Sequence, residues 1–267
     1  MSGCLSCDSA SLVTPAVIGR PRLRDRNTGW PALVLGWLAA LCCPGCAEPE
    51  PVPKPATPAP PQAVSAMPRQ VLDDEFVSSE TCRECHADQH SSWHASFHRT
   101  MTQPATPQAV VAPFENVRLK LDGRTFRLSR DGDEFWAELP DPDIESDLAA
   151  RGVNLSERDV PTVRRRVLLT TGSHHLQHYW VGSQRDGGLF NLPWEFFIAE
   201  KRWIPMADTH IIPPDQPRNV TQWNVNCIRC HSVNGVPGLD RHKRQWSTRV
   251  AGFGIACEAC HGPAARH

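Results

Sequence analysis

Three copies of one short string, C-x-x-C-H, constrain this 267-residue chain more than any other feature. They stand at Cys82–His86, Cys227–His231 and Cys257–His261. These strings contain six of the eleven cysteines, and the other five lie within the first 46 residues. A disulfide framework does not repeat one fixed spacing with a histidine always next to the second cysteine. The repeated string therefore indicates a chemical role for these cysteines.

The string has the residue types and the spacing of a covalent attachment site for haem c. Two thiols three positions apart can add to the two vinyl groups on one porphyrin edge, and the adjacent histidine then ligates the iron. The sequence thus predicts three haems c, attached through Cys82, Cys85, Cys227, Cys230, Cys257 and Cys260, with His86, His231 and His261 as proximal ligands. Cysteine pairs also build disulfides and four-cysteine zinc sites, here from the second and third strings. Neither alternative needs the adjacent histidine.

The amino terminus has the pattern of an export signal. Arginines from Arg20 to Arg26 precede an apolar stretch from Trp30 to Leu41, and that stretch is shorter than the about 20 residues of a membrane-spanning helix. Gly45-Cys46 is similar to the site where bacterial lipoproteins are cut and acylated. A membrane tether through Cys46, simple secretion and an uncleaved anchor all fit. Residues 1–46 are predicted to direct the protein to the periplasm or cell surface.

The rest of the chain divides by composition and pattern. Residues 47–70 are rich in proline and alanine and predict an extended linker. Residues 71–267 are predicted to form the haem-bearing domain, of α+β class with much irregular structure and short helices around the motifs. The segment from Ser79 to His98 predicts a helix capped by Ser78 or Ser79. Residues 116–205 predict a β-rich insertion of hairpins between the first and second motifs, with a turn at Asp131-Gly132.

Several segments resemble a known family. "CRECHADQHSSWHASFH", "CIRCHSVNG" and "GIACEACHGPAARH" resemble the multihaem cytochromes of the cytochrome c-554 type, which are related to the octahaem hydroxylamine oxidoreductases. "TGSHHLQHYW" and "LPWEFF" resemble segments of bacterial multihaem cytochromes that precede tetratricopeptide arrays. The resemblance covers about residues 79–267 and implies closely packed haems, mostly with histidine on both iron faces, that move electrons. Members of this family commonly have four or more haem motifs, and this sequence has three. An alternative prediction is therefore that the chain is part of a larger multihaem or repeat protein.

Nine of the twelve histidines lie outside the motifs and are candidates for the second, distal iron ligand. On a continuous helix His98 would lie about 18 Å along the axis from His86, whereas two ligands of one iron lie about 4 Å apart. His98 is therefore predicted to ligate another haem, and His90 and His94 to face solvent or porphyrin edges. The resemblance gives His98, in W-x-x-S-x-H, and His267, after C-H-G-P, the role of ligand to a neighbouring haem.

The third distal ligand is predicted among His174, His175 and His178, with His175 chosen. On a strand, His174 and His178 would share one face and His175 would lie on the other. His210, His242 and Met101 are the reserve candidates.

The functional prediction is an electron-transfer protein that exchanges electrons with redox partner proteins. A net charge of −1 gives no basic excess for binding nucleic acid. One rival is a haem enzyme that acts on a small nitrogen or sulfur compound at an iron with one open face. A second rival uses the haems as structural staples. The sequence favours electron transfer over enzymatic activity.

Overall fold

The computed structural model describes residues 65–155, 158–210 and 220–267. They belong to the second of two compact units of the chain, which begins at Ala59. The predicted export segment with Cys46, and the linker up to residue 64, lie outside the described residues. None of the helices in the described part is long and apolar enough to cross a membrane.

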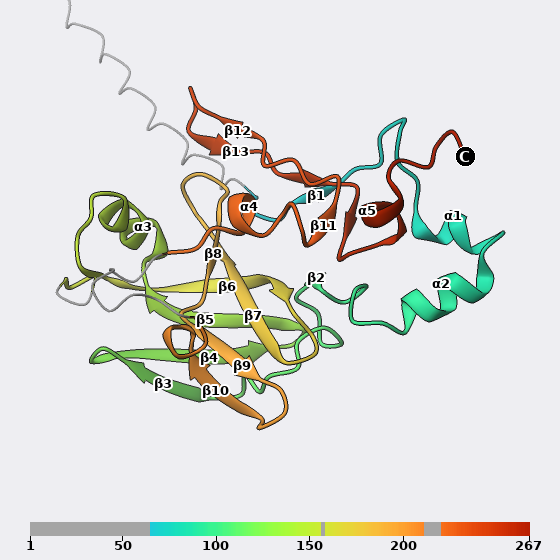
Figure 1. Ribbon diagram of the computed structural model, residues 1–267. Helices are drawn as coiled ribbons and strands as arrows, with labels where there is room; N and C mark the ends of the chain where they lie inside the picture. Colours follow the sequence, from blue (N-terminus) through green and yellow to red (C-terminus); the bar gives the residue numbers. More distant parts are fainter. Residues whose placement is uncertain (1–64, 156–157, 211–219) are drawn as a thin grey trace, which may run out of the picture. The chain divides into compact units, whose positions relative to one another are not determined.

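A nine-stranded antiparallel sheet forms the body of this unit (Figure 1). The order of its main path is β10-β9-β7-β6-β5-β4-β3, with β2 paired to β6 and β8 paired to β7. The strands are β2 (Thr102–Pro104), β3 (Val117–Leu121), β4 (Arg124–Asp131), β5 (Glu134–Pro140), β6 (Thr162–Thr171), β7 (Leu176–Gly182), β8 (Leu189–Asn191), β9 (Trp194–Phe197) and β10 (Arg202–Pro205). All nine lie between the first and second motifs, and all but β2 lie within the predicted insertion of residues 116–205.

The β4–β5 hairpin shows how the sequence pattern builds this sheet. Asp131 pairs with Glu134, so the chain reverses directly after the Asp131 of the Asp131-Gly132 dipeptide, through Gly132 and Asp133, and Gly132 takes a φ of 57°. Such a dipeptide favours a tight hairpin because glycine adopts positive φ without steric cost. Alternate residues of β4, including Phe126 and Leu128, are buried on one face. This face covers the first of two hydrophobic cores.

The β6–β7 hairpin differs from the expectation at its turn. Gly172 has a φ of +87°, and a Cβ there would lie 2.2 Å from the carbonyl oxygen of Leu176, so no larger residue fits. The strand β7 begins only at Leu176, and His174 and His175 lie in the turn. Placing His174 on a strand face was therefore wrong. A tight glycine turn shortened the strand that the apolar pattern predicted.

The two faces of β7 meet different cores. Tyr179 and Val181 belong to the first core, under the sheet. Trp180 points to the other side and belongs to a second core with Trp223 and Ile228, next to the second motif. The second motif thus packs against one face of the sheet through this second core.

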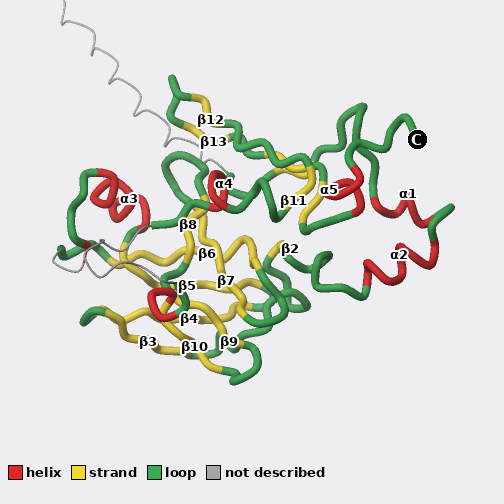
Figure 2. The backbone as a smooth tube through the Cα atoms, in the orientation of Figure 1, coloured by secondary structure: helices red, strands yellow, loops and turns green. Residues whose placement is uncertain are grey.

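Short elements and loops make up the remainder (Figure 2). The helices are α1 (Ser79–Arg83), α2 (Ala87–His94), α3 (Pro142–Ala150), η2 (Met206–Asp208), α4 (Trp223–Asn226) and α5 (Cys257–His261). The two-stranded pairs are β1 (Arg69–Gln70) with β14 (Arg249–Val250), β11 (Ser232–Val233) with β15 (Gly252–Phe253), and β12 (Leu239–Asp240) with β13 (Gln245–Trp246). A sheet-rich body with few short helices agrees with the predicted mixed, irregular class.

The single helix expected from Ser79 to His98 is wrong. The chain forms α1 and α2 instead, and His86 lies between them with φ −119° and ψ 50°. The hydroxyl oxygen of Ser78 accepts a hydrogen bond from the amide of Glu80 at 3.2 Å, so Ser78 is the expected cap. Because the helix breaks, the axial rise of about 18 Å does not describe the separation of His86 and His98.

Ordered structure begins before residue 71. β1 pairs in parallel with β14, and the amide of Arg69 donates to the carbonyl oxygen of Thr248 at 3.0 Å. Ala66 is buried in the second core. The folded unit therefore includes residues 66–70, which the sequence assigned to the linker.

A buried carboxylate attaches α3 to the sheet. Asp143, only 3% exposed, accepts hydrogen bonds from the Ser183 hydroxyl at 2.5 Å and the Gln184 amide at 3.1 Å. The buried guanidinium of Arg165 lies 3.5 Å from the same side chain. A buried charge needs such partners, so this cluster fixes α3 against β6 and the loop after β7.

Candidate functional site

The first and third motifs meet at one cavity of about 660 Å³. Cys82 is on α1, and the third motif forms α5, which packs against α1. Burial raises the pKa of the Cys82 thiol, and the neighbouring Cys257 raises it further, so the first cysteines of the two motifs are adjacent. The volume lies within the range of about 300–1,000 Å³ that holds small molecules and cofactors. The histidines that line the cavity are His86, His90, His98, His261 and His267.

His86 and His267 face each other across this cavity. Their ring centres lie 6.1 Å apart, with the ring planes inclined by 32°. Two imidazoles on opposite faces of one metal ion, each bonded at about 2 Å, place their ring centres roughly 6 Å apart. The two residues lie on segments far apart in sequence. The distance between their rings is therefore set by the tertiary fold and not by the spacing of residues along one helix.

Glu258 positions His267. Its carboxylate is 6% exposed and lies at the start of α5, between the two cysteines of the third motif. It accepts hydrogen bonds from the amide of Val77, at 3.1 Å to each oxygen, and from the amide of Ala264 at 2.9 Å. One side chain therefore joins the segment before α1 to the tail that ends in His267.

The backbone of His98 is attached to the segment that leads into the third motif. The amide of Ile255 donates to the His98 carbonyl oxygen at 2.9 Å, and Trp93 Nε1 donates to the Ile255 carbonyl oxygen at 2.8 Å. A Cβ on Gly254 would lie 2.3 Å from the Arg99 carbonyl oxygen, so the two chains touch at a glycine. This contact places His98 beside the third motif.

His90 does not face solvent, which was one of the two environments predicted for it. It is 6% exposed, and its Nε2 has no hydrogen-bond partner, the nearest acidic oxygen being that of Glu80 at 3.5 Å. His90 is therefore the imidazole that α2 contributes to the cavity lining.

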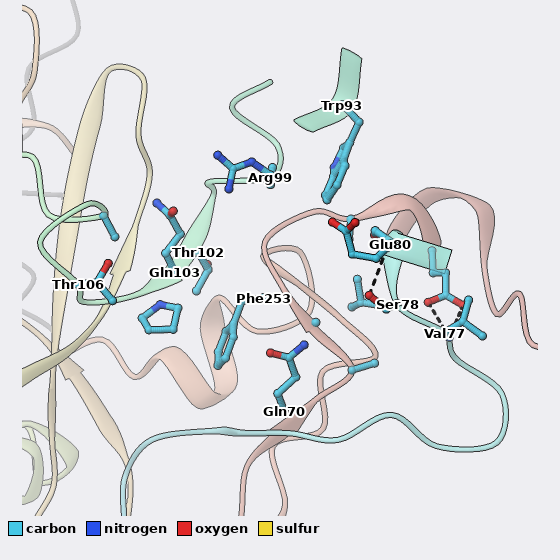
Figure 3. A pocket seen from close by; sticks show the side chains of 18 residues that line it. Gln70, Val77, Ser78, Glu80, Trp93, Arg99, Thr102, Gln103, Thr106 and Phe253 are labelled. Carbon is cyan, nitrogen blue, oxygen red and sulfur yellow. Dashed lines mark hydrogen bonds between the residues drawn. The ribbon is translucent and has the colours of Figure 1, made fainter. Parts of the chain in front are cut away.

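A second hollow, of about 370 Å³, adjoins this cavity (Figure 3). It lies between β2, which contributes Thr102 and Gln103, and the segments around Ser78 and Phe253. Trp93 and Glu258 line both hollows. The hollow separates the paired motifs from the sheet and contains none of the predicted haem-binding residues.

The second motif lies apart from this pair, against the second core. Cys227 follows α4 directly and packs against the core that contains Trp180, Trp223 and Ile228. Burial raises the pKa of Cys227 to about 11. Burial also lowers the pKa of His231, and its Nδ1 is buried without a hydrogen-bond partner.

Two further histidines lie near the second motif, around a buried carboxylate. Glu195 on β9 is fully buried, and its Oε1 lies 3.2 Å from His178 Nδ1 and 3.4 Å from His210 Nδ1. The Thr209 hydroxyl donates to its Oε2 at 2.8 Å. Burial first, and then His210 and His231, lower the pKa of His178 to about 4. Burial raises the pKa of Glu195.

His175, the residue chosen from the sequence, has a different environment. The ring of His175 packs against the ring of His174, with their centres 4.0 Å apart, and the ring of His174 stacks in turn on Phe97 at 4.0 Å. His175 and His174 are both exposed. Sequence reasoning missed the roles of Glu258 and Glu195, since no spacing distinguishes either carboxylate from a surface acid.

The alternatives for the cysteines are not seen in the described part of the chain. All six motif cysteines are free thiols, and no group of three or more His, Cys, Asp or Glu residues there could hold a metal ion. Among the described residues, the cysteines of the second and third motifs are therefore not gathered into one such group. Cys257 lies next to Cys82 instead.

Comparison with known proteins gives only partial likenesses. No family model and no curated protein matches the sequence. Two solved structures are similar: the outer cell wall cytochrome OcwA, with a TM-score of 0.43 and 19% identity over 72% of this chain, and an undecahaem cytochrome from the S-layer of Carboxydothermus ferrireducens, with a TM-score of 0.37 and 17% identity over 75%. This chain spans 32% and 22% of those proteins. Likenesses this partial do not assign a function.

Proposed function

We propose that this chain is an exported electron-transfer protein that carries three covalently attached haems c. The observation that carries the proposal is the meeting of the first and third C-x-x-C-H strings at one cavity, with His86 and His267 at the spacing of two axial ligands. The assignment to the cytochrome c-554 type stays a prediction from the sequence resemblance.

The residues present fit haem c in three respects. Each motif presents two free thiols and a histidine in consecutive register. The shared cavity has the volume of a cofactor site. The buried nitrogens His90 Nε2 and His231 Nδ1 have no hydrogen-bond partner. Haem supplies one-electron chemistry at its iron, and axial ligands and burial set its potential.

For the first and third haems we propose reciprocal ligation. His267, from the tail after the third motif, would complete the iron held by His86, to which it is adjacent. His98, from the segment after the first motif, would complete the iron held by His261, because its backbone is bonded to the segment before α5. Two haems on one cavity would lie close enough for direct electron exchange with each other, and redox partner proteins would supply and accept the electrons.

Mass spectrometry of the intact protein, produced in a host with cytochrome c maturation, tests the haem count. We expect the polypeptide plus three haems, and one haem fewer in each of three variants whose paired motif cysteines are replaced by serine. A bound zinc ion, or no added mass, would contradict the proposal.

Electron transfer and catalysis differ in the occupancy of the iron faces. If both faces of every iron carry protein ligands, the reduced wild-type protein does not bind carbon monoxide. Stoichiometric binding by one haem would favour the alternative of a haem enzyme with one open face.

Export follows from the arginine-flanked apolar run and is tested separately. Fusion of residues 1–69 to a reporter that is active only outside the cytoplasm should give activity. Labelled lipid that is attached to the wild-type protein and absent from Cys46→Ala would establish a membrane tether, and its absence from both would leave secretion or an uncleaved anchor. A silent reporter would contradict export.

A further inference from the structure

The second motif packs against the core that covers one face of β7. We infer that His178, which lies beside the buried carboxylate of Glu195, is the distal ligand of the haem attached at Cys227 and Cys230. This inference rests on the proposed haem binding and replaces the prediction of His175 for this role.

The first argument is the face of β7 on which His178 lies. Residues two apart on a strand share a face, so His178 points to the same side as Trp180. Trp180 packs in the second core with Trp223 and Ile228, and Cys227 packs against the same core. The side chain of His178 therefore points to the side of the sheet where the second motif lies.

The second argument is that α4 and the second motif are fixed to the neighbouring strand. The amide of Leu189 on β8 donates to Asn224 Oδ1 at 2.7 Å, and the amide of Thr221 donates to Asn191 Oδ1 at 2.9 Å. Phe190 and Gln222 form an isolated bridge between the same segments. Because β8 pairs with β7, these bonds hold the second motif against the strand that carries His178.

The third argument is the orientation of the imidazole. Leu176 pairs with Phe197 and Gln177 with Phe196, and the same register continues to His178 opposite Glu195. His178 Nδ1 lies 3.2 Å from Glu195 Oε1, a buried oxygen without a hydrogen-bond partner, so Nδ1 faces the carboxylate and Nε2 is the nitrogen left for an iron. Metal-bound histidines commonly donate their other ring N–H to a carboxylate, which fixes the ring and increases its basicity.

Competing residues have weaker positions. His175 lies in the turn after Gly172, exposed and in contact with His174. His210 shares Glu195, but its Nδ1 is also 2.9 Å from the Thr209 hydroxyl and 3.1 Å from the Met206 carbonyl oxygen, and its side chain is 50% exposed against 23% for His178. His178 is the better buried and the more directly attached to the sheet.

The test uses the full-length haem-loaded protein and its iron coordination. In His178→Ala we expect one haem of three to become high-spin and to bind one equivalent of carbon monoxide when reduced. Adding imidazole should restore the low-spin spectrum. His175→Ala and His210→Ala are the matched controls and should keep the wild-type spectrum. Replacing Cys227 and Cys230 by serine in the His178→Ala background should abolish the carbon monoxide site.

Two conservative variants separate ligation from structural support. His178→Met can still ligate, so it should stay low-spin while the potential of a single haem rises. Glu195→Gln should keep three low-spin haems and raise the potential of the same haem, because the carboxylate no longer increases the basicity of the imidazole. A variant of Glu195 with all potentials unchanged would overturn its positioning role.

The outcomes distinguish this inference from the proposed function. Three haem masses with a carbon monoxide site in His175→Ala or His210→Ala, or in none of the three alanine variants, would overturn the assignment of His178 alone. A wild-type protein without three haem masses would overturn the haem proposal together with it.

Discussion

Replacing Glu258 by alanine is expected to release the carboxy-terminal tail from the first motif. The carboxylate is 6% exposed and accepts hydrogen bonds from two backbone donors, Val77 and Ala264. Hydrogen bonds to charged groups contribute about 1.5–3 kcal/mol each, so two donors give an upper figure of about 3–6 kcal/mol. Both donor residues are only half-buried and water can replace part of the loss, so we expect about 2–4 kcal/mol.

Amide hydrogen exchange measures this local opening directly. Each 1.4 kcal/mol corresponds to a tenfold change, so we expect exchange in residues 75–80 and 262–267 to accelerate by roughly 30-fold to 1,000-fold. Glu258→Gln keeps a carbonyl oxygen as acceptor and should lose about half as much free energy. In the haem-loaded protein, Glu258→Ala should also weaken the His267 ligand and give a partly high-spin first haem.

Glu84→Ala is the matched control, because Glu84 is also between the two cysteines of its motif but is exposed. Its exchange rates in both segments should equal those of the wild-type protein. Equal protection in Glu258→Ala and Glu84→Ala would refute the argument that this carboxylate holds the tail.

The remaining predictions concern ligation, buried charge and pH. His267→Ala and His98→Ala should each make one haem high-spin and reactive with carbon monoxide, at the first and the third motif respectively, as shown by the double variants that lack that motif's cysteines; an unchanged spectrum in either would remove that residue from the ligand set. Asp143→Ala should lower the free energy of unfolding in urea by about 3–5 kcal/mol, because it leaves the buried Arg165 guanidinium with fewer partners; a loss below about 1 kcal/mol would contradict the anchoring of α3. The Arg185 side chain lowers the pKa of Asp147. This pair therefore stabilises the fold above the unfolded pKa of about 3.9, and its contribution is lost as the pH falls through the folded pKa. The contribution to the free energy of unfolding is no more than about 1 kcal/mol, because both side chains are partly exposed. The melting temperature of Asp147→Asn should thus be below that of the wild-type protein at pH 7 and converge with it near pH 3; a constant difference would contradict the linkage.

The parts of the fold that the sequence predicts are those fixed by local rules. The turn at Asp131-Gly132 follows from the conformational freedom of glycine, and the buried alternation of β4 from the two faces of a strand. The attachment strings are equally local, because their chemistry needs only five consecutive residues. These signals are read correctly without any knowledge of the tertiary structure.

The helix from Ser79 to His98 shows where local reasoning fails. No glycine or proline interrupts that segment, so propensity alone favours one helix. The chain instead breaks at His86 and ends α2 at His94, where the Trp93 side chain bonds to Ile255 and the His98 backbone to the same residue. These partners are more than 150 residues away in sequence, as the 162-residue separation of the Trp93 bond shows. Tertiary contacts determine the conformation of this segment. The predicted axial separation of His86 and His98 required one continuous helix, which the chain does not form.

Distal ligands are the hardest element to predict, because a metal ion needs its second ligand in space and not in sequence. A histidine surplus makes every candidate plausible by spacing, and His174, His175 and His178 are nearly adjacent. What separates them is the strand boundary at Leu176, which puts two of them in a turn and one on a face of the sheet. The buried Glu195 then distinguishes His178 further, although it reads in sequence as one acid within an aromatic strand. In both candidate haem environments, therefore, a buried carboxylate lies close to the proposed ligand: Glu258 accepts from the Ala264 amide, three residues before His267, and Glu195 lies beside a ring nitrogen of His178.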